Sequence, residues 1–246
     1  MGFMGTTARA QFDDYGVKFG LGTATLADDL STESPILGVN AGAYVNYTFK
    51  HSPTALAEIF YLQTGINIIR RGNSFQEIYE YDNNLSFREG FHHAYYVQVP
   101  ILAGVHFELP IREPGHIVGF FLGPAVSYGL FGRYADRMIT PSYTSRSANY
   151  DVNFSGTAAD RALFNHISHL DVSAILGLSY EHGNYTFSLF VDHGFIAVSE
   201  DVDVLRIIND AQAGITTNIN NLPKIPNGNN NAVMFSVAYK LGAFQK

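Results

Sequence analysis

The sequence predicts an all-β protein: an eight-stranded antiparallel transmembrane up-and-down β-barrel with short periplasmic turns and long extracellular loops. Three observations lead to this fold class. Charged residues make up only 15% of the 246-residue chain, whereas a typical soluble domain contains about 25%. Apolar residues alternate with small or polar ones over long segments, which is typical of β-strands. The connections between these segments alternate between short and long.

The composition excludes several other classes of protein. The chain is 14% aromatic, so it lacks the aromatic-poor composition of a disordered segment. It contains no cysteine, which excludes a disulfide-stabilised scaffold. No run approaches the roughly 18 consecutive apolar residues of a transmembrane helix. The net charge is −7 and the 15 Lys and Arg residues form no basic stripe, so we expect no nucleic-acid partner.

Residues 1–14 are expected to form an N-terminal tail, and residues 15–246 the outer-membrane barrel domain. Ala8, Arg9 and Ala10, followed by Gln11, form the small-x-small pattern of a signal-peptidase site. We therefore interpret the tail as a residual signal peptide.

Eight segments are predicted to be strands, at residues 15–22, 36–49, 55–70, 94–107, 119–130, 170–181, 185–194 and 232–241. In seven of them one phase of the alternation is apolar and free of charge, and the other is rich in Gly, Ser and Asn. Segment 55–70 is less regular. Glu58 and Thr64 share one phase, and Gln63 and Asn67 share the other, so a β-bulge is expected there.

Aromatic residues lie near the ends of the apolar faces. Such residues form the girdles that flank the apolar band of a transmembrane barrel. The predicted girdle consists of Tyr15, Tyr47, Phe49, Tyr95, Phe107, Tyr180, Tyr185 and Tyr239.

Short and long connections alternate strictly. The short ones lie at residues 51–53, 108–116 and 182–184, and the long, polar ones at residues 27–35, 72–93, 132–165 and 197–230. Outer-membrane barrels have short periplasmic turns, longer extracellular loops and an even number of strands. We therefore expect both termini on the periplasmic side of the outer membrane of a Gram-negative cell.

A soluble eight-stranded barrel of the lipocalin type would also alternate. Its polar face would point to water and should be rich in Lys and Glu. Here that phase consists mostly of small uncharged residues, which suit the crowded interior of a narrow barrel. The membrane barrel is therefore the favoured interpretation.

The sequence resembles the small outer-membrane β-barrel family of Bacteroidetes, the PorT-like or porin-family "outer membrane protein beta-barrel domain" group. The most specific part is residues 95–102, YYVQVPIL, which is similar to the family's strand aromatic-x-Gln-Ile-Pro-Leu-Leu. Gly123-Pro124 resembles the glycine-rich GxGP pattern of the family's next strand. Asp171, Gly177 and Glu181 resemble the Asp…Gly…Glu spacing of its sixth strand. The last strand departs from the family's pattern, in which such barrels usually end at a terminal aromatic residue. Here five residues, GAFQK, follow Leu241. The resemblance implies the fold and an outer-membrane location, and one branch of the family is linked to protein secretion.

No catalytic group, cofactor site or metal site is expected. Asp192 and His193 are adjacent on a predicted strand, so their side chains point to opposite faces. His92-His93 and the pair His166 and His169 lack a third ligand at a suitable spacing. We therefore expect a protein that is not an enzyme.

Charged residues of the inward phase are expected to form two structural clusters. Lys18 and Lys240 should meet Glu58 and Glu181 near the periplasmic mouth, because barrel closure makes the first and last strands neighbours. Asp171 and Asp192 should lie together near the other mouth, with Arg133 as the candidate cation. Because side chains just fill an eight-stranded barrel, we expect a plugged lumen.

The expected partners are outer-membrane lipids, including lipopolysaccharide, and proteins that bind the extracellular loops or periplasmic turns. Two functions from different classes stay open. One is a passive barrel with a structural or surface-binding role. The other is a component of a secretion or assembly machinery, and a small porin-like channel is a further alternative.

Overall fold

The structure is a computed structural model that describes residues 11–27, 32–48, 59–81, 84–110, 115–139, 145–155, 166–198 and 228–243. Its strands are β1 (Gln11–Ala27), β2 (Thr32–Thr48), β3 (Phe60–Tyr81), β4 (Asn84–Glu108), β5 (His116–Ile139), β6 (Ser145–Asp151), β7 (Asn153–Ser155), β8 (His166–Ser168), β9 (Leu170–His182), β10 (Tyr185–Ala197) and β11 (Asn229–Ala243). Among these residues no helix is long and apolar enough to cross a membrane.

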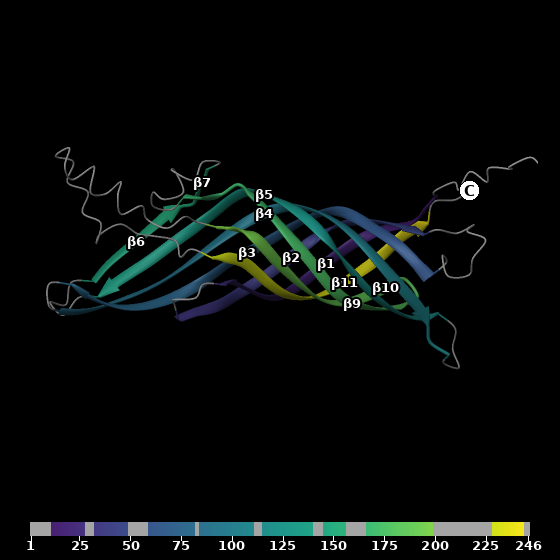
Figure 1. Cartoon of the computed structure of the whole chain (residues 1–246), viewed down its shortest axis with the longest axis horizontal. Helices are drawn as coiled ribbons and strands as arrows, with labels where there is room; N and C mark the ends of the chain where they lie inside the picture. The colour runs from purple at the N-terminus through teal and green to yellow at the C-terminus, as the bar shows by residue number, and fades with distance from the viewer. Residues whose placement is uncertain are drawn as a thin grey trace, which may run out of the picture.

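Eight of these strands close into an antiparallel ring in the order β1-β2-β3-β4-β5-β9-β10-β11, and β11 pairs with β1. Strand β6 extends the sheet from residues 133–139 of β5, and β7 and β8 form a short parallel pair. Figure 1 shows an elongated barrel. We call the end where β1 begins and β11 ends the terminal end, and the end where β3 turns into β4 the hairpin end. The predicted barrel is confirmed.

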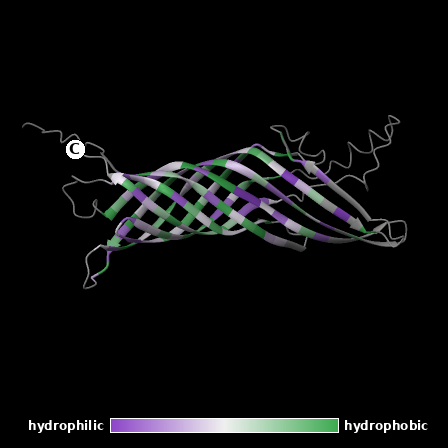
Figure 2. Ribbon diagram, turned by 180° about the vertical axis from the view of Figure 1, so that it is seen from behind, coloured by the Kyte–Doolittle hydropathy of each residue, from purple (hydrophilic) through white to green (hydrophobic). Residues whose placement is uncertain are grey.

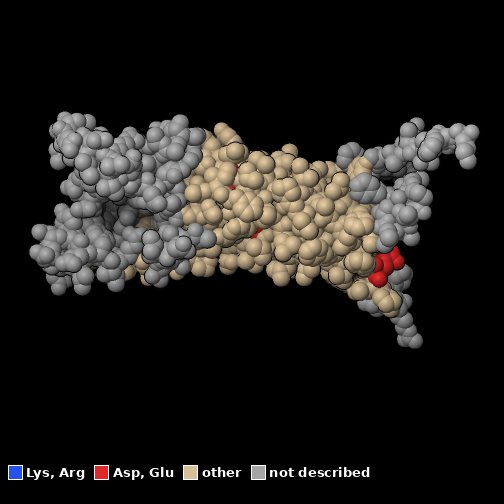
Figure 3. All heavy atoms as spheres, in the orientation of Figure 1, with Lys and Arg blue, Asp and Glu red and all other residues tan. Residues whose placement is uncertain are grey.

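The predicted faces are confirmed for the strands with a regular alternation. Val99 and Leu176 point outward and are 42% and 50% exposed, whereas Gln98 and Ser173 are fully buried in the lumen. Green and purple residues accordingly alternate along the strands in Figure 2. On the face drawn in Figure 3, the described middle of the barrel shows almost only uncharged atoms. A closed ring also pairs the backbone groups of its strands internally. The apolar exterior and the paired backbone together suit a lipid bilayer.

The hairpin end is built differently from the prediction. Residues 72–93 were expected to form a long loop, but β3 and β4 continue through them and pair up to Tyr81 and Asn84. Asn73 and Phe75 are buried on the inward side of this extension. The polar residues that suggested a loop are therefore part of the alternation of a strand.

Residues 132–165 were likewise expected to be a loop, but β5 continues to Ile139 and then pairs with β6. The pairing of β5 with β4 shifts between Tyr95 and Tyr96. This shift makes Leu130 an extra residue in β5. It inverts the faces of β5 beyond that point, because one added residue moves each following side chain to the other face.

The bulge expected in segment 55–70 is wrong for the part described. All pairs between β3 and β4 keep a single register. Thr64 lies on the outward face, and its hydroxyl donates to the carbonyl oxygen of Pro100 at 2.8 Å. An internal hydrogen bond therefore explains the polar residue on the apolar side.

The barrel begins earlier than the boundary at residue 15. Strand β1 starts at Gln11, and Asp14 forms an ion pair with Lys240. Residues 11–14 thus belong to the barrel wall and not to the tail.

Candidate functional site

A buried ion cluster spans the lumen near the hairpin end. Arg71 on β3 donates from Nη1 to Asp171 Oδ2 on β9 and from Nη2 to Asp192 Oδ2 on β10. The three side chains are at most 3% exposed. Because β3 and β10 lie opposite each other in the eight-strand ring, this cluster crosses the full width of the lumen.

Polar side chains from two more strands complete the cluster. Gln98 Nε2 on β4 donates to Asp192 Oδ2 at 2.8 Å, and Asn230 Nδ2 on β11 donates to Asp171 Oδ2 at 3.1 Å. The guanidinium carbon of Arg71 lies 5.7 Å from the centre of the Tyr96 ring. We call these residues, together with Arg71, Asp171 and Asp192, the upper cluster.

A glycine makes room for the upper cluster. A Cβ atom added to Gly194 on β10 would lie 3.0 Å from both carboxylate oxygens of Asp171. Such contacts are tight, so the absence of a side chain at Gly194 lets the Asp171 carboxylate sit close to the wall.

The prediction placed both aspartates correctly but named the wrong cation. Arg133 is exposed on the outer face, because the extra residue Leu130 in β5 inverts the faces beyond it. Arg71 was missed because the predicted strand ended at residue 70. Continuing the inward phase of Asn67 along β3 would have reached it.

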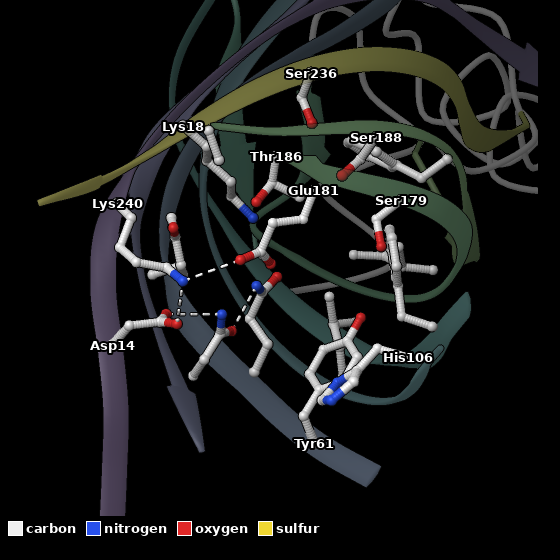
Figure 4. Close-up of a pocket in the computed structure, with 18 of the residues that line it drawn as sticks. Asp14, Lys18, Tyr61, His106, Ser179, Glu181, Thr186, Ser188, Ser236 and Lys240 are labelled. Atoms are coloured by element: carbon white, nitrogen blue, oxygen red, sulfur yellow. Dashed lines mark hydrogen bonds and ion pairs between the residues drawn. The ribbon is translucent and has the colours of Figure 1, made fainter. Parts of the chain in front are cut away.

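A second cluster lies at the terminal end (Figure 4). Lys240 Nζ on β11 is 3.0 Å from Glu181 Oε1 on β9 and 3.1 Å from Asp14 Oδ2 on β1. Asn46 Nδ2 donates to Asp14 Oδ1 at 2.9 Å, and Gln63 Nε2 donates to Asn46 Oδ1 at 2.8 Å. We call these five residues the lower cluster.

The lower cluster corresponds in part to the predicted one. Lys240 and Glu181 meet as expected. Asp14 was missed because it was assigned to the tail. Lys18 lines the cavity of the lumen that the lower cluster also borders. Among the described residues Lys18 forms no ion pair. Glu58 lies outside the described residues.

A cavity of about 510 Å³ fills the lumen between the two clusters. Gln98 lines it toward the upper cluster, and Lys240 lines it toward the lower one. One part of its wall consists of hydroxyl groups, and another carries the stacked rings of Tyr61 and His106, 5.8 Å apart. The wall includes Ser179, Thr186, Ser188 and Ser236.

The predicted girdle residues that the structure describes all belong to outward phases of the strands. Tyr185 and Tyr239 pack together with ring centres 5.2 Å apart at the terminal end. Tyr95 stacks on Phe131 at 4.8 Å toward the hairpin end. The others are Tyr15, Tyr47, Phe107 and Tyr180, and Phe49 lies outside the described residues.

The histidines do not assemble with other ligands in the part of the chain that is described. There, no group of three or more His, Cys, Asp or Glu residues is placed to hold a metal ion. His92 is buried in the lumen, and its neighbour His93 lies on the outward face. Asp192 and His193 point to opposite faces, as predicted, because Asp192 is buried and His193 is exposed.

Comparison with known proteins identifies one family. The family model described as outer membrane protein beta-barrel domain matches residues 10–199. No curated protein matches the chain. Among solved structures, the chain is similar to Ail, the attachment invasion locus protein of Yersinia pestis. That similarity has a TM-score of 0.35 and 9% sequence identity, and it covers 93% of this chain and 99% of Ail. The finer resemblance to PorT-like proteins stays a prediction.

Proposed function

The chain belongs to the outer membrane protein beta-barrel domain family, and on that premise we propose that it is a non-enzymatic barrel whose lumen is closed to solutes. The observation that carries this proposal is the upper cluster. Arg71 reaches from one side of the lumen to carboxylates on the other. These side chains occupy the space that a solute would have to cross.

The burial of the upper cluster explains why it should stay closed. Arg71, Asp171 and Asp192 are almost inaccessible to solvent. Separating them would leave charges buried without partners, and the desolvation penalty of each ion is still several kcal/mol after relaxation. A permeating ion would have to replace these contacts as well as lose its own water. The closed arrangement is therefore the stable one.

The proposal includes an orientation of the barrel, which the lengths of the turns support. The turn between β9 and β10, the start of β1 and the end of β11 lie at the terminal end, whereas β3, β4 and β5 extend the wall at the hairpin end (Figure 1). Because outer-membrane barrels keep short turns in the periplasm, the hairpin end faces the outside. The extended strands then offer a surface to partners outside the cell.

Planar-bilayer recording tests the closed lumen. The unmodified protein should show no steady conductance after insertion, and a mobility shift on unheated gels should confirm that the inserted protein is folded. Replacing Arg71, Asp171 and Asp192 together by alanine should produce stepwise currents, because it removes the charged side chains that cross the lumen. A steady channel in the unmodified protein would contradict the proposal and favour a small porin-like function.

A further inference from the structure

The outward face of the barrel changes character toward the hairpin end. On β3 the outward residues Ile66 and Ile68 are well exposed and apolar, and the next outward residue is Arg70. On β5 the exposed Phe131 is followed on the same face by Arg133. Two arginines thus lie directly beyond the apolar band.

The register of the strands brings the two arginines to one place. Arg70 lies opposite Tyr95, and Arg133 lies opposite His93. His93 and Tyr95 are neighbours on the outward face of β4, with ring centres 5.9 Å apart. Neighbouring strands are about 4.8 Å apart, so the backbones of β3 and β5 are roughly 10 Å apart. The two long side chains therefore flank His93 from either side.

The polar atoms at the centre of this group lack partners. Arg70 Nε and His93 Nδ1 are both buried and have no hydrogen-bond partner. Arg70 Nε is a donor, and His93 Nδ1 donates in the tautomer that carries its proton there. An unsatisfied buried donor is costly, so a ligand that accepts hydrogen bonds would be stabilised here. These unpartnered atoms support a ligand site independently of the positive charge.

The charges that face this group leave it positive. Glu89, farther along the same face, is paired with Arg137 at 3.7 Å. Asp151 on β6 lies opposite Arg133. Among the side chains that the structure describes, the two arginines and the carboxylate of Asp151 leave a net charge of +1.

We propose that Arg70, His93 and Arg133 bind a phosphate group of a lipid in the outer leaflet, the lipopolysaccharide. Guanidinium groups bind phosphate through two parallel hydrogen bonds. The stacked rings of Tyr95 and Phe131 border the group, and aromatic girdles lie at the interface between lipid tails and head groups. The assignment to the outer leaflet rests on the orientation proposed above.

A binding experiment in neutral detergent micelles tests this site. The folded barrel is titrated with bisphosphorylated lipid A, with lipid A from which both phosphates have been removed, and with inorganic phosphate. The measurement is the rise in the temperature at which the barrel loses its fast mobility on gels. The unmodified protein should respond to bisphosphorylated lipid A and much less to the other two compounds.

Variants assign the response to the proposed residues. The double variant Arg70→Gln and Arg133→Gln should bind bisphosphorylated lipid A at least about tenfold more weakly, because it loses charge-assisted hydrogen bonds. Arg137→Gln is the matched control and should bind as the unmodified protein does. Arg133→Gln alone, at an exposed position, gives an independent measurement and should already weaken binding.

Three outcomes would overturn the proposal. The double variant could bind as tightly as the unmodified protein, or the dephosphorylated lipid could bind as tightly as the phosphorylated one. An equal response to inorganic phosphate would show that the anion comes from solution and not from a lipid. None of these results depends on conductance, so they are separate from a failure of the closed lumen in planar bilayers.

Discussion

Replacing Arg71 by methionine removes the cation that two buried carboxylates share. Arg71 donates to both Asp171 and Asp192. After the substitution, Gln98 still donates a hydrogen bond to Asp192, and Asn230 still donates one to Asp171. Neither of these amides carries a charge. Methionine keeps the apolar stem of the arginine side chain but lacks the guanidinium carbon and its two terminal nitrogens. The change therefore removes the charge together with the hydrogen bonds from Nη1 and Nη2.

The expected loss of stability follows from the burial of the three groups. The side chains of Arg71, Asp171 and Asp192 are 1%, 3% and 0% exposed, so water screens none of them. Removing one partner of a buried ion pair typically costs about 3–5 kcal/mol, because an uncompensated charge stays behind. Replacing both aspartates by asparagine in the same chain removes that charge. This triple variant should recover most of the lost free energy of unfolding, since uncharged substitutes for a buried ion group are often close to neutral.

Urea unfolding of the barrel in micelles, followed by circular dichroism and gel mobility, measures these differences. The chain has no tryptophan, so tyrosine emission is the available fluorescence signal. Arg137→Met is the control: this pair is 3.7 Å apart and half exposed, and exposed pairs contribute less than about 1 kcal/mol. If Arg71→Met cost no more than Arg137→Met, or if the triple variant were as unstable as Arg71→Met alone, the reasoning would be refuted.

Three further predictions concern the wall and the lumen. Val99→Arg should cost about 2–4 kcal/mol of stability in lipid vesicles if it lies near the bilayer midplane. Val99→Leu should cost little, and equal effects would contradict the assigned faces. Gly194→Ala should cost about 1–3 kcal/mol by overpacking, because its Cβ would press on the Asp171 carboxylate and on the backbone oxygen of Asn230. In a chain that already carries Asp171→Ala, Gly194→Ala should cost less; strictly additive costs would argue against the contact with Asp171. Lys240→Ala should cost about 1–2 kcal/mol in urea unfolding, because two partly buried carboxylates lose their cation, and an unchanged midpoint would show that the lower cluster contributes no stability.

The inward aspartates were predictable because their strands are regular. Strands β9 and β10 are joined by a tight turn at Gly183 and pair without a register shift. Alternation alone therefore placed Asp171 and Asp192 in the lumen and put His193 outside. The meeting of Lys240 with Glu181 followed in the same way from phase and from barrel closure.

The prediction missed the cation of the upper cluster for two physical reasons. A single extra residue, Leu130, moves Arg133 to the outer face, and nothing in the local composition marks that position. The inward phase of β3 continues through Arg71 and Asn73, but polar residues in a lumen look like those of a loop. Alternation identifies strands well where one face is apolar, and it fails where polar side chains are packed against one another.

The two clusters differ in what solvent can reach, and this difference makes the lumen asymmetric. In the lower cluster the side chains of Asp14, Glu181 and Lys240 are 15–27% exposed, so water reaches them and screens their charges. In the upper cluster the exposures of Arg71 and its aspartates do not exceed 3%. The cavity between them is therefore accessible from the terminal end and closed at the hairpin end. Water screens the charges of the lower cluster but not those of the upper one. Removing a single charge should therefore cost more stability in the upper cluster than in the lower one, and the upper cluster should provide most of the resistance to permeation.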